Sequence, residues 1–299
     1  MAISVVRRHP HFFADIRGLD LTRPLTDDEV RLVDAAMTEH AVVAIRGQPI
    51  SDEDHIRFSR LFGPLELPPS KATLSGRRLR AELYDASNLN AAGEILAPDD
   101  PFRQFSKGNE LWHTDSSYKP LPTKWSLLRG VIVPPDGGDT EFIDMRAVYA
   151  ALSPAMQERI EDLVAEHDIW HSRRRAGFGD VSETQRRVSP PAEQPLVRIA
   201  ADGRKSLYIG AHASHIVGWP IEQGRALLDE LYAFATQERF IYGHSWEIGD
   251  LVVWDNRCTM HRAGGYESLA HKRDMRRTTN MEYGEENDDP LGVRAAATS

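Results

Sequence analysis

Cysteine is almost absent from this sequence of 299 residues, which contains only Cys258. A chain with one thiol cannot form an internal disulfide, so we exclude a disulfide-stabilised secreted domain and expect a reducing compartment. Long apolar runs are missing as well, because no window approaches the roughly 18 consecutive apolar residues of a membrane-spanning helix. The N-terminal stretch also lacks an apolar segment of signal-peptide length. We therefore expect a cytoplasmic protein with no membrane partner.

Positive charge is also in short supply. The chain has 36 Lys and Arg residues against 45 Asp and Glu residues, which gives a formal net charge of -9. Nucleic-acid-binding domains normally present a basic surface, so we expect no nucleic-acid partner. A small anionic ligand stays compatible with this composition, because a few buried arginines can create a local field of opposite sign.

Short strand-like runs separated by Gly and Pro dominate the sequence from residue 111 onward. Together with helical patterns at 26–41, 51–63, 145–166 and 220–236, they predict a mainly β fold with flanking helices, either a barrel or a sandwich. No change in composition marks a linker, so we expect one domain over residues 1–299 with a core at about 9–283.

Two segments read as loops. Residues 65–110 carry many charges and prolines, which predicts long loops around one or two strands. Residues 171–195 are poor in large apolar side chains and include the arginines at 173–175. We interpret this second segment as a candidate lid loop and its arginine run as solvated.

The stretch "LWHTDSSY" at 111–118 carries the strongest chemical pattern. Residues i and i+2 of an extended chain point the same way, so His113 and Asp115 can share a ligand. His261, in "VVWDNRCTMHRA", offers a third group. Two histidines and one carboxylate on one face of an iron leave three positions open, the arrangement of non-haem Fe(II) oxygenases. A His-x-Asp pair alone is weak evidence, and a structural hydrogen bond is the alternative interpretation.

The arginines in "RDMRRTT" indicate an anion-binding site. Arg273 and Arg277 lie four residues apart, so in a strand they share one face. A buried guanidinium is costly unless an anion meets it, and its planar fork suits a carboxylate. One of the two can hold a dicarboxylate cosubstrate and the other an acidic substrate. Thr140 begins a strand-like run after the glycine pair in "GGDTEF".

The order of these motifs resembles the taurine dioxygenase superfamily of Fe(II)/α-ketoglutarate-dependent dioxygenases. Within it, the sequence is most similar to the enzymes that act on 2,4-dichlorophenoxyacetate (2,4-D). The similarity runs from about residue 9 to about residue 280. It rests on the stretches "RGQPIS", "FGPLE", "LWHTDSSY", "VIVPPDGGDTEF", "DMRAVYAAL", "IGAHASHI" and "GDLVVWDNRCTMHR".

The resemblance implies a double-stranded β-helix, or jelly roll, in which His113, Asp115 and His261 bind Fe(II). It also implies α-ketoglutarate and O2 as cosubstrates, with Arg273 and Thr140 at the far carboxylate of α-ketoglutarate. Trp254 is a candidate neighbour of the same cosubstrate, although a tryptophan in an apolar strand is more often part of the core. Relatives in this superfamily are commonly oligomers, which implies a homo-oligomer.

The implied reaction hydroxylates the carbon next to the ether oxygen of an aryloxyacetate and gives a phenol, glyoxylate, succinate and CO2. Candidate contacts with this small anionic aromatic substrate are Arg277, Lys71 and His212. Solvated lysine and core histidine are the plainer interpretations of the last two. Two other functions stay open: the same chemistry on taurine, another sulfonate or an alkyl sulfate, and a non-catalytic metal-binding sensor.

Overall fold

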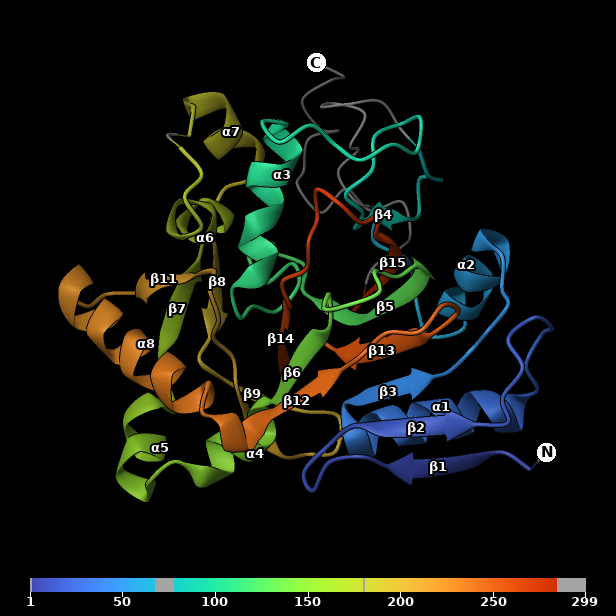
Figure 1. The fold of residues 1–299 in the computed structure, drawn as a ribbon. Coiled ribbons are helices and arrows are strands. Elements are labelled where there is room, and N and C mark those ends of the chain that lie inside the picture. Colours follow the sequence, from blue (N-terminus) through green and yellow to red (C-terminus); the bar gives the residue numbers. More distant parts are fainter. Residues whose placement is uncertain (1, 68–77, 180, 284–299) are drawn as a thin grey trace, which may run out of the picture.

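Two facing sheets form the centre of the protein in the computed structural model, which describes residues 2–67, 78–179 and 181–283 (Figure 1). The larger sheet has the order β1-β2-β3-β13-β5-β15-β4, and the smaller has the order β12-β6-β14. Their strands are β1 (Ser4–Arg7), β2 (Ala14–Arg17), β3 (Val42–Ile45), β4 (Tyr84–Asp85), β5 (Thr123–Ile132), β6 (Thr140–Asp144), β12 (Ile241–His244), β13 (Leu251–Asp255), β14 (Thr259–Ala263) and β15 (Asp274–Met281).

Apolar side chains from both sheets fill the space between them. Val252 and Trp254 of β13 and Leu128 of β5 belong to the same buried cluster as Phe142 of β6. Strand β13 is buried at every position, which explains its unbroken apolar run "LVVW" in the sequence. The two sheets therefore enclose a continuous core, and β14, which carries the candidate ligand His261, belongs to the smaller of them.

Helices α1 (Asp27–His40) and α2 (Asp52–Arg60) cover the outer face of the larger sheet. Each begins with a capping box, in which Thr26 and Ser51 accept hydrogen bonds from the backbone three residues later. Val33 and Met37 of α1 then pack against Val43 of β3 and Val253 of β13. The sequence predicted both helices, because the cap and the helical spacing of apolar residues agree.

A second layer surrounds the smaller sheet. It consists of α4 (Met145–Ala151), α5 (Pro154–Ile160), α8 (Ile221–Ala235), η3 (Glu238–Phe240), β7 (Val164–His167), β8 (Ala192–Pro195), β9 (Val197–Ile199), β10 (Lys205–Leu207) and β11 (Ala213–Ile216). Leu227 and Leu231 of α8 share a buried cluster with Ile143 of β6 and Met260 of β14. This layer therefore supports β6 and β14 of the smaller sheet from the side opposite the central core.

Two segments differ from the loops expected from the sequence. Residues 65–110 contain helix α3 (Pro101–Ser106) and the 3-10 helix η2 (Lys107–Glu110), and Asp100 caps α3 by accepting from Phe102 N–H. Residues 171–195 hold most of α6 (Ile169–Arg175), then α7 (Glu183–Val188) and β8, so the expected lid loop has regular structure. Among the helices described, none has the length and apolar character needed to cross a membrane.

Candidate metal centre

His113 and His261 are brought together by a backbone bridge. His261 lies within β14, and His113 N–H donates to its carbonyl at 3.0 Å while His261 N–H donates back at 2.8 Å. The chain then turns at 115–118, where Ser116 has a φ of 55°. The extended conformation expected for 111–118 is therefore wrong beyond His113, because the bridge is isolated and no strand continues past it.

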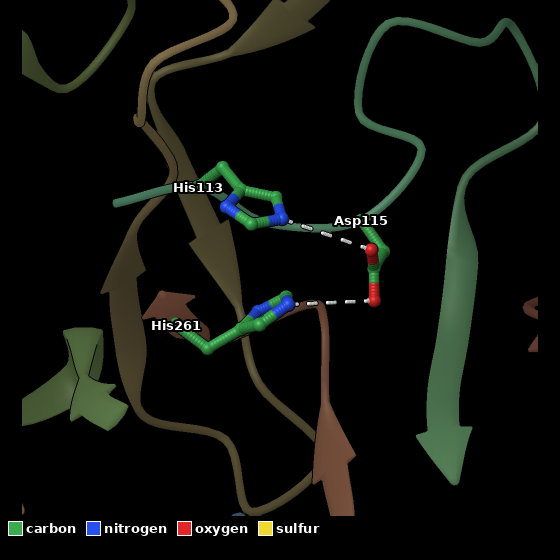
Figure 2. Close-up of side chains that lie close together, drawn as sticks. All are labelled: His113, Asp115 and His261. Carbon is green, nitrogen blue, oxygen red and sulfur yellow. Dashed lines mark ion pairs between the residues drawn. The ribbon is translucent and has the colours of Figure 1, made fainter. Parts of the chain in front are cut away.

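The two imidazoles point at one carboxylate, as Figure 2 shows. Nε2 of His113 lies 4.0 Å from Oδ1 of Asp115, and Nε2 of His261 lies 3.8 Å from Oδ2. The three candidate ligand atoms lie within 4.8 Å of one another, and all three residues are buried. These separations exceed the length of a hydrogen bond, so they leave room for one ion among the three groups.

Neighbouring groups orient two of the three ligands, His113 and Asp115, while Nδ1 of His261 has no hydrogen-bond partner among the described residues. The carbonyl of Leu111 lies 2.7 Å from Nδ1 of His113, so Nδ1 carries the proton and Nε2 presents its lone pair to a metal. Ser126 Oγ donates to Oδ2 of Asp115 at 2.7 Å, and Arg277 forms an ion pair with Oδ1. His113 and Asp115 are thus held in a defined orientation by groups of the protein itself.

Electrostatics favour the protonation states that a cation needs. Burial lowers the pKa of both His113 and His261, which keeps their imidazoles neutral. Burial alone would raise the pKa of Asp115, but the charge of Arg277 and the hydrogen bond from Ser126 oppose it, and that pKa lies below its usual range. The donor set of two neutral imidazoles and one carboxylate fits a divalent transition metal such as Fe(II).

Arg273 lies just before β15 of the larger sheet, and Thr140 begins β6 of the smaller sheet. Arg273 precedes β15 and is buried, with Nη2 donating to the carbonyl of Gly138 at 3.1 Å and Nε without a hydrogen-bond partner among the described residues. Gly138 has a φ of +72°, and a Cβ there would lie 3.3 Å from Nε of Arg273, so glycine suits this close approach. Thr140 Oγ1 accepts from Trp246 Nε1 at 3.0 Å.

Arg273 also lines a cavity of about 190 Å³. Other residues on its wall are Tyr84, Asn109 and Tyr266, together with Ala263 from the end of β14. Arg276, three residues later, instead pairs with Asp274 at 2.9 Å and with Asp52 at 2.6 Å. Arg273, unlike Arg276, therefore has a donor available for an anion in the cavity.

Three other residues predicted from the sequence, Trp254, His212 and Arg277, lie beside the candidate metal ligands. The Trp254 ring centroid is 4.6 Å from that of His261, and the buried His212 ring lies edge-on to His113 at 5.8 Å. Arg277 contacts Asp115 as described. Lys71 lies outside the described residues.

Sequence reasoning missed two polar residues beneath the metal ligands. Asn256 Nδ2 donates to Ser126 Oγ at 2.9 Å, and its Oδ1 accepts from Trp254 Nε1 at 3.0 Å. Asn256 belongs to the "WDNR" stretch, which offered a signal. Ser126 offered none, since its role depends on pairing across strands opposite Trp254.

Comparison with known proteins agrees with this geometry. Residues 5–279 match the family described as "Taurine catabolism dioxygenase TauD, TfdA family". The chain is 45% identical over 284 residues to the alpha-ketoglutarate-dependent 2,4-dichlorophenoxyacetate dioxygenase of Cupriavidus pinatubonensis, covering 94% of this chain and 99% of that protein. It is 35% identical to the (S)-phenoxypropionate/alpha-ketoglutarate-dioxygenase of Sphingobium herbicidovorans, covering 87% of this chain and 92% of that protein.

A solved structure of a similar protein has the same fold. The crystal structure of AAD-2 in complex with Mn(II) and N-oxalylglycine matches with a TM-score of 0.91 and 42% identity, covering 96% of this chain and 100% of that chain. The jelly roll with flanking helices that the sequence predicted is thereby confirmed. The chain belongs to the taurine catabolism dioxygenase TauD, TfdA family and is an oxidoreductase of the dioxygenase class.

Proposed function

We propose that the protein is an Fe(II)- and α-ketoglutarate-dependent dioxygenase acting on an aryloxyacetate such as 2,4-D. It hydroxylates the carbon next to the ether oxygen and gives the phenol and glyoxylate, with succinate and CO2. The observation that carries this proposal is the convergence of His113, Asp115 and His261 in a chain 45% identical to a 2,4-D dioxygenase.

His113, Asp115 and His261 hold the metal in this proposal. When bound, the ferrous ion with α-ketoglutarate and O2 supplies the oxidising chemistry, which belongs to the cofactor and not to a protein side chain. The contribution of the chain is to keep the two imidazoles neutral and the carboxylate ionised. The Leu111 carbonyl and the Ser126 hydroxyl keep these ligands oriented.

Arg273 binds the far carboxylate of α-ketoglutarate, assisted by Thr140. Support comes from its burial beside the cavity with an unpartnered Nε, because such a group is costly until an anion reaches it. Support also comes from the similar AAD-2 structure, whose N-oxalylglycine has the same two terminal carboxylates as α-ketoglutarate. Trp254, packed against His261, limits water at this side.

Arg277, His212 and Lys71 are proposed to contact the substrate. Arg277 already has Asp115 as its counter-charge, but its Nε has no hydrogen-bond partner among the described residues. His212 lies beside the metal ligand His113.

We also propose a cytoplasmic location and a homo-oligomer. Cell fractionation and light scattering of the purified protein test these two points.

Turnover measurements test the function directly. Purified protein with Fe(II), ascorbate and α-ketoglutarate should release a phenol and succinate from 2,4-D. A panel with taurine, another sulfonate and an alkyl sulfate identifies the substrate class by succinate release, and the His113→Ala variant is the control for metal dependence. Absence of phenol from every aryloxyacetate would exclude the proposed substrate. Absence of succinate with every acid, despite bound iron, would favour a sensor.

A further inference from the structure

The segment that joins β14 to β15 ends at Arg273. It covers residues 264–273, and none of it lies in a helix or strand. A strand holds Arg273 only on its following side, where β15 begins at Asp274. A binding group whose backbone is free to move loses affinity, because its motion must be frozen when the ligand binds. The contacts that hold residues 264–273 in place therefore bear on the proposed cosubstrate site.

Asn88 binds this segment at three residues. It is buried, and its Nδ2 donates to the carbonyls of Ser268 at 2.8 Å and His271 at 2.9 Å. Its Oδ1 accepts from the backbone N–H of Arg273 at 2.8 Å. The backbone N–H of Asn88 also donates to the carbonyl of Arg273 at 3.2 Å. Residue 88 therefore binds both backbone polar groups of Arg273.

These bonds extend the edge of the larger sheet. Strand β4 pairs antiparallel with β15, and the two lie side by side in Figure 1. Beyond β4, the N–H of Ala86 donates to the carbonyl of Met275 at 3.0 Å, so the pairing continues as far as Asn88 and Arg273. The side-chain amide of Asn88 then fastens the turn at 268–271 to the same point.

Asn88 and Arg273 also line the same cavity, together with Ser268. The guanidinium of Arg273 has one hydrogen bond among the described residues, from Nη2 to the carbonyl of Gly138, so its location depends on that of its backbone. Asn88 has no amide N–H left for an anion, because both are donated to carbonyls of the protein. Its effect on an anion in the cavity is therefore exerted through Arg273.

We propose that Asn88 is the positioning residue for Arg273 and sets the affinity for the cosubstrate α-ketoglutarate. By holding the backbone of Arg273 and the turn before it, Asn88 keeps the guanidinium preorganised for the far carboxylate. This inference rests on the proposed function, in which Arg273 binds that carboxylate. It adds a residue whose side chain bonds to the backbone of this segment and not to the metal ligands.

A general bracing role for Asn88 makes a different prediction. If Asn88 only stabilised residues 264–273, its loss would also disturb the preceding strand β14, which carries His261, and iron binding would weaken. Its effect would also persist after removal of the Arg273 guanidinium. A positioning role instead confines the loss to α-ketoglutarate. That loss disappears without the guanidinium, because two residues that act through one contact are not additive.

The experiment titrates α-ketoglutarate into the intact protein loaded anaerobically with Fe(II) and follows the visible metal-to-ligand absorption band. Asn88→Ala should raise the α-ketoglutarate Kd about tenfold, which corresponds to the loss of one of two charged hydrogen bonds. Its Fe(II) Kd should stay that of wild type. In an Arg273→Met background, the same substitution should change the α-ketoglutarate Kd by less than about twofold, the usual error of additivity.

Asn90→Ala is the matched control. Among the described residues, the side-chain hydrogen bonds of Asn90 stay within its own turn, to Ala92 and Glu94. This variant should leave the Kd of both Fe(II) and α-ketoglutarate unchanged. If Asn88→Ala does not fold, Asn88→Ser is carried through the same measurements and judged by the same criteria.

The outcomes separate this inference from the proposed function. An unchanged α-ketoglutarate Kd in Asn88→Ala, beside a raised Kd in Arg273→Met, would overturn the inference alone. A weaker Fe(II) Kd, or an equal loss in the Arg273→Met background, would overturn it in favour of general bracing. A loss that requires Arg273 supports it even if 2,4-D releases no phenol, in which case only the substrate assignment fails. If iron-loaded wild-type protein gives no band with α-ketoglutarate, the cosubstrate assignment and this inference fail together.

Discussion

Arg273 provides a test in which ligand affinity and fold stability respond independently. Replacing it by Met removes a buried guanidinium that has no carboxylate partner among the described residues, so the metal-free, ligand-free protein should be at least as stable as wild type. The cosubstrate site should lose its anion contact at the same time. Most substitutions of a buried polar residue cost stability, so this combination would be unusual.

The expected size of the affinity loss follows from the number of bonds. A guanidinium can make two parallel hydrogen bonds to a carboxylate, each worth at least about 1.5 kcal/mol because the groups are charged. Their loss amounts to about 3 kcal/mol, or roughly 100-fold in affinity. A ligand present at 100 times its Kd stabilises the wild type by about 2.7 kcal/mol, and this falls to about 0.4 kcal/mol after a 100-fold loss.

Thermal melting with Mn(II) and N-oxalylglycine, which is not turned over, measures both quantities. The ligand should raise the wild-type Tm by about 4 °C and the Arg273→Met Tm by less than about 1 °C. Arg276→Met is the matched control: its loss breaks ion pairs to Asp274 and Asp52, so it should lower the unliganded Tm and keep the full ligand-induced shift. A ligand shift in Arg273→Met equal to that of wild type would refute the assignment of the cosubstrate arginine.

Three further predictions concern the metal ligands and the core. His261→Ala should abolish stoichiometric iron binding, measured by elemental analysis, while its unliganded circular dichroism stays that of wild type; retained iron would exclude this histidine as a ligand. Ser126→Ala removes the hydrogen bond to Asp115 Oδ2, so the iron Kd should rise about tenfold, and an unchanged Kd would contradict the orienting role. Burial lowers the pKa of His55 and of His167 to about 3, so the unfolded protein binds more protons between pH 6.5 and 3. Stability is full above pH 6.5 and lost as pH falls, by roughly 2–3 kcal/mol between pH 7.5 and 5.5 for the two together. Urea midpoints across this range test it, and a flat profile would contradict it.

The sequence predicted features correctly where the residue types and their short-range spacing indicate the same structure or site. The pair His113 and Asp115 stood out because two ligand types share one short motif, and the capping boxes at Thr26 and Ser51 defined two helices. The convergence of His261 with them followed from the family resemblance and not from spacing. The backbone that carries His113 and Asp115 also differs from the expected strand, because a single backbone bridge and a turn replace it.

Contacts that depend on distant segments could not be predicted. Ser126 supports Asp115 only because β5 pairs with β13 in a register that places Ser126 opposite Trp254. Helix α3 was missed because its six residues, from Pro101 to Ser106, are too few to establish a helical period. The two failures have different origins: the partner of Ser126 lies far away in the sequence, and α3 is shorter than the pattern that would reveal it.

The arginine run at 173–175 shows most clearly what composition conceals. Three consecutive arginines in an apolar-poor segment indicated a solvated loop, yet they end helix α6, where Arg174 and Arg175 are exposed and Arg173 is buried. A net charge of -9 likewise describes the whole chain and not the cavity. What matters for a site that receives anions is the charge left after every internal pair is counted. In the described ranges, the buried arginines that form no ion pair are Arg173 and Arg273. For the cosubstrate, the proposed anion contact accordingly falls on Arg273, a buried arginine beside the cavity that the fold leaves without an ion pair.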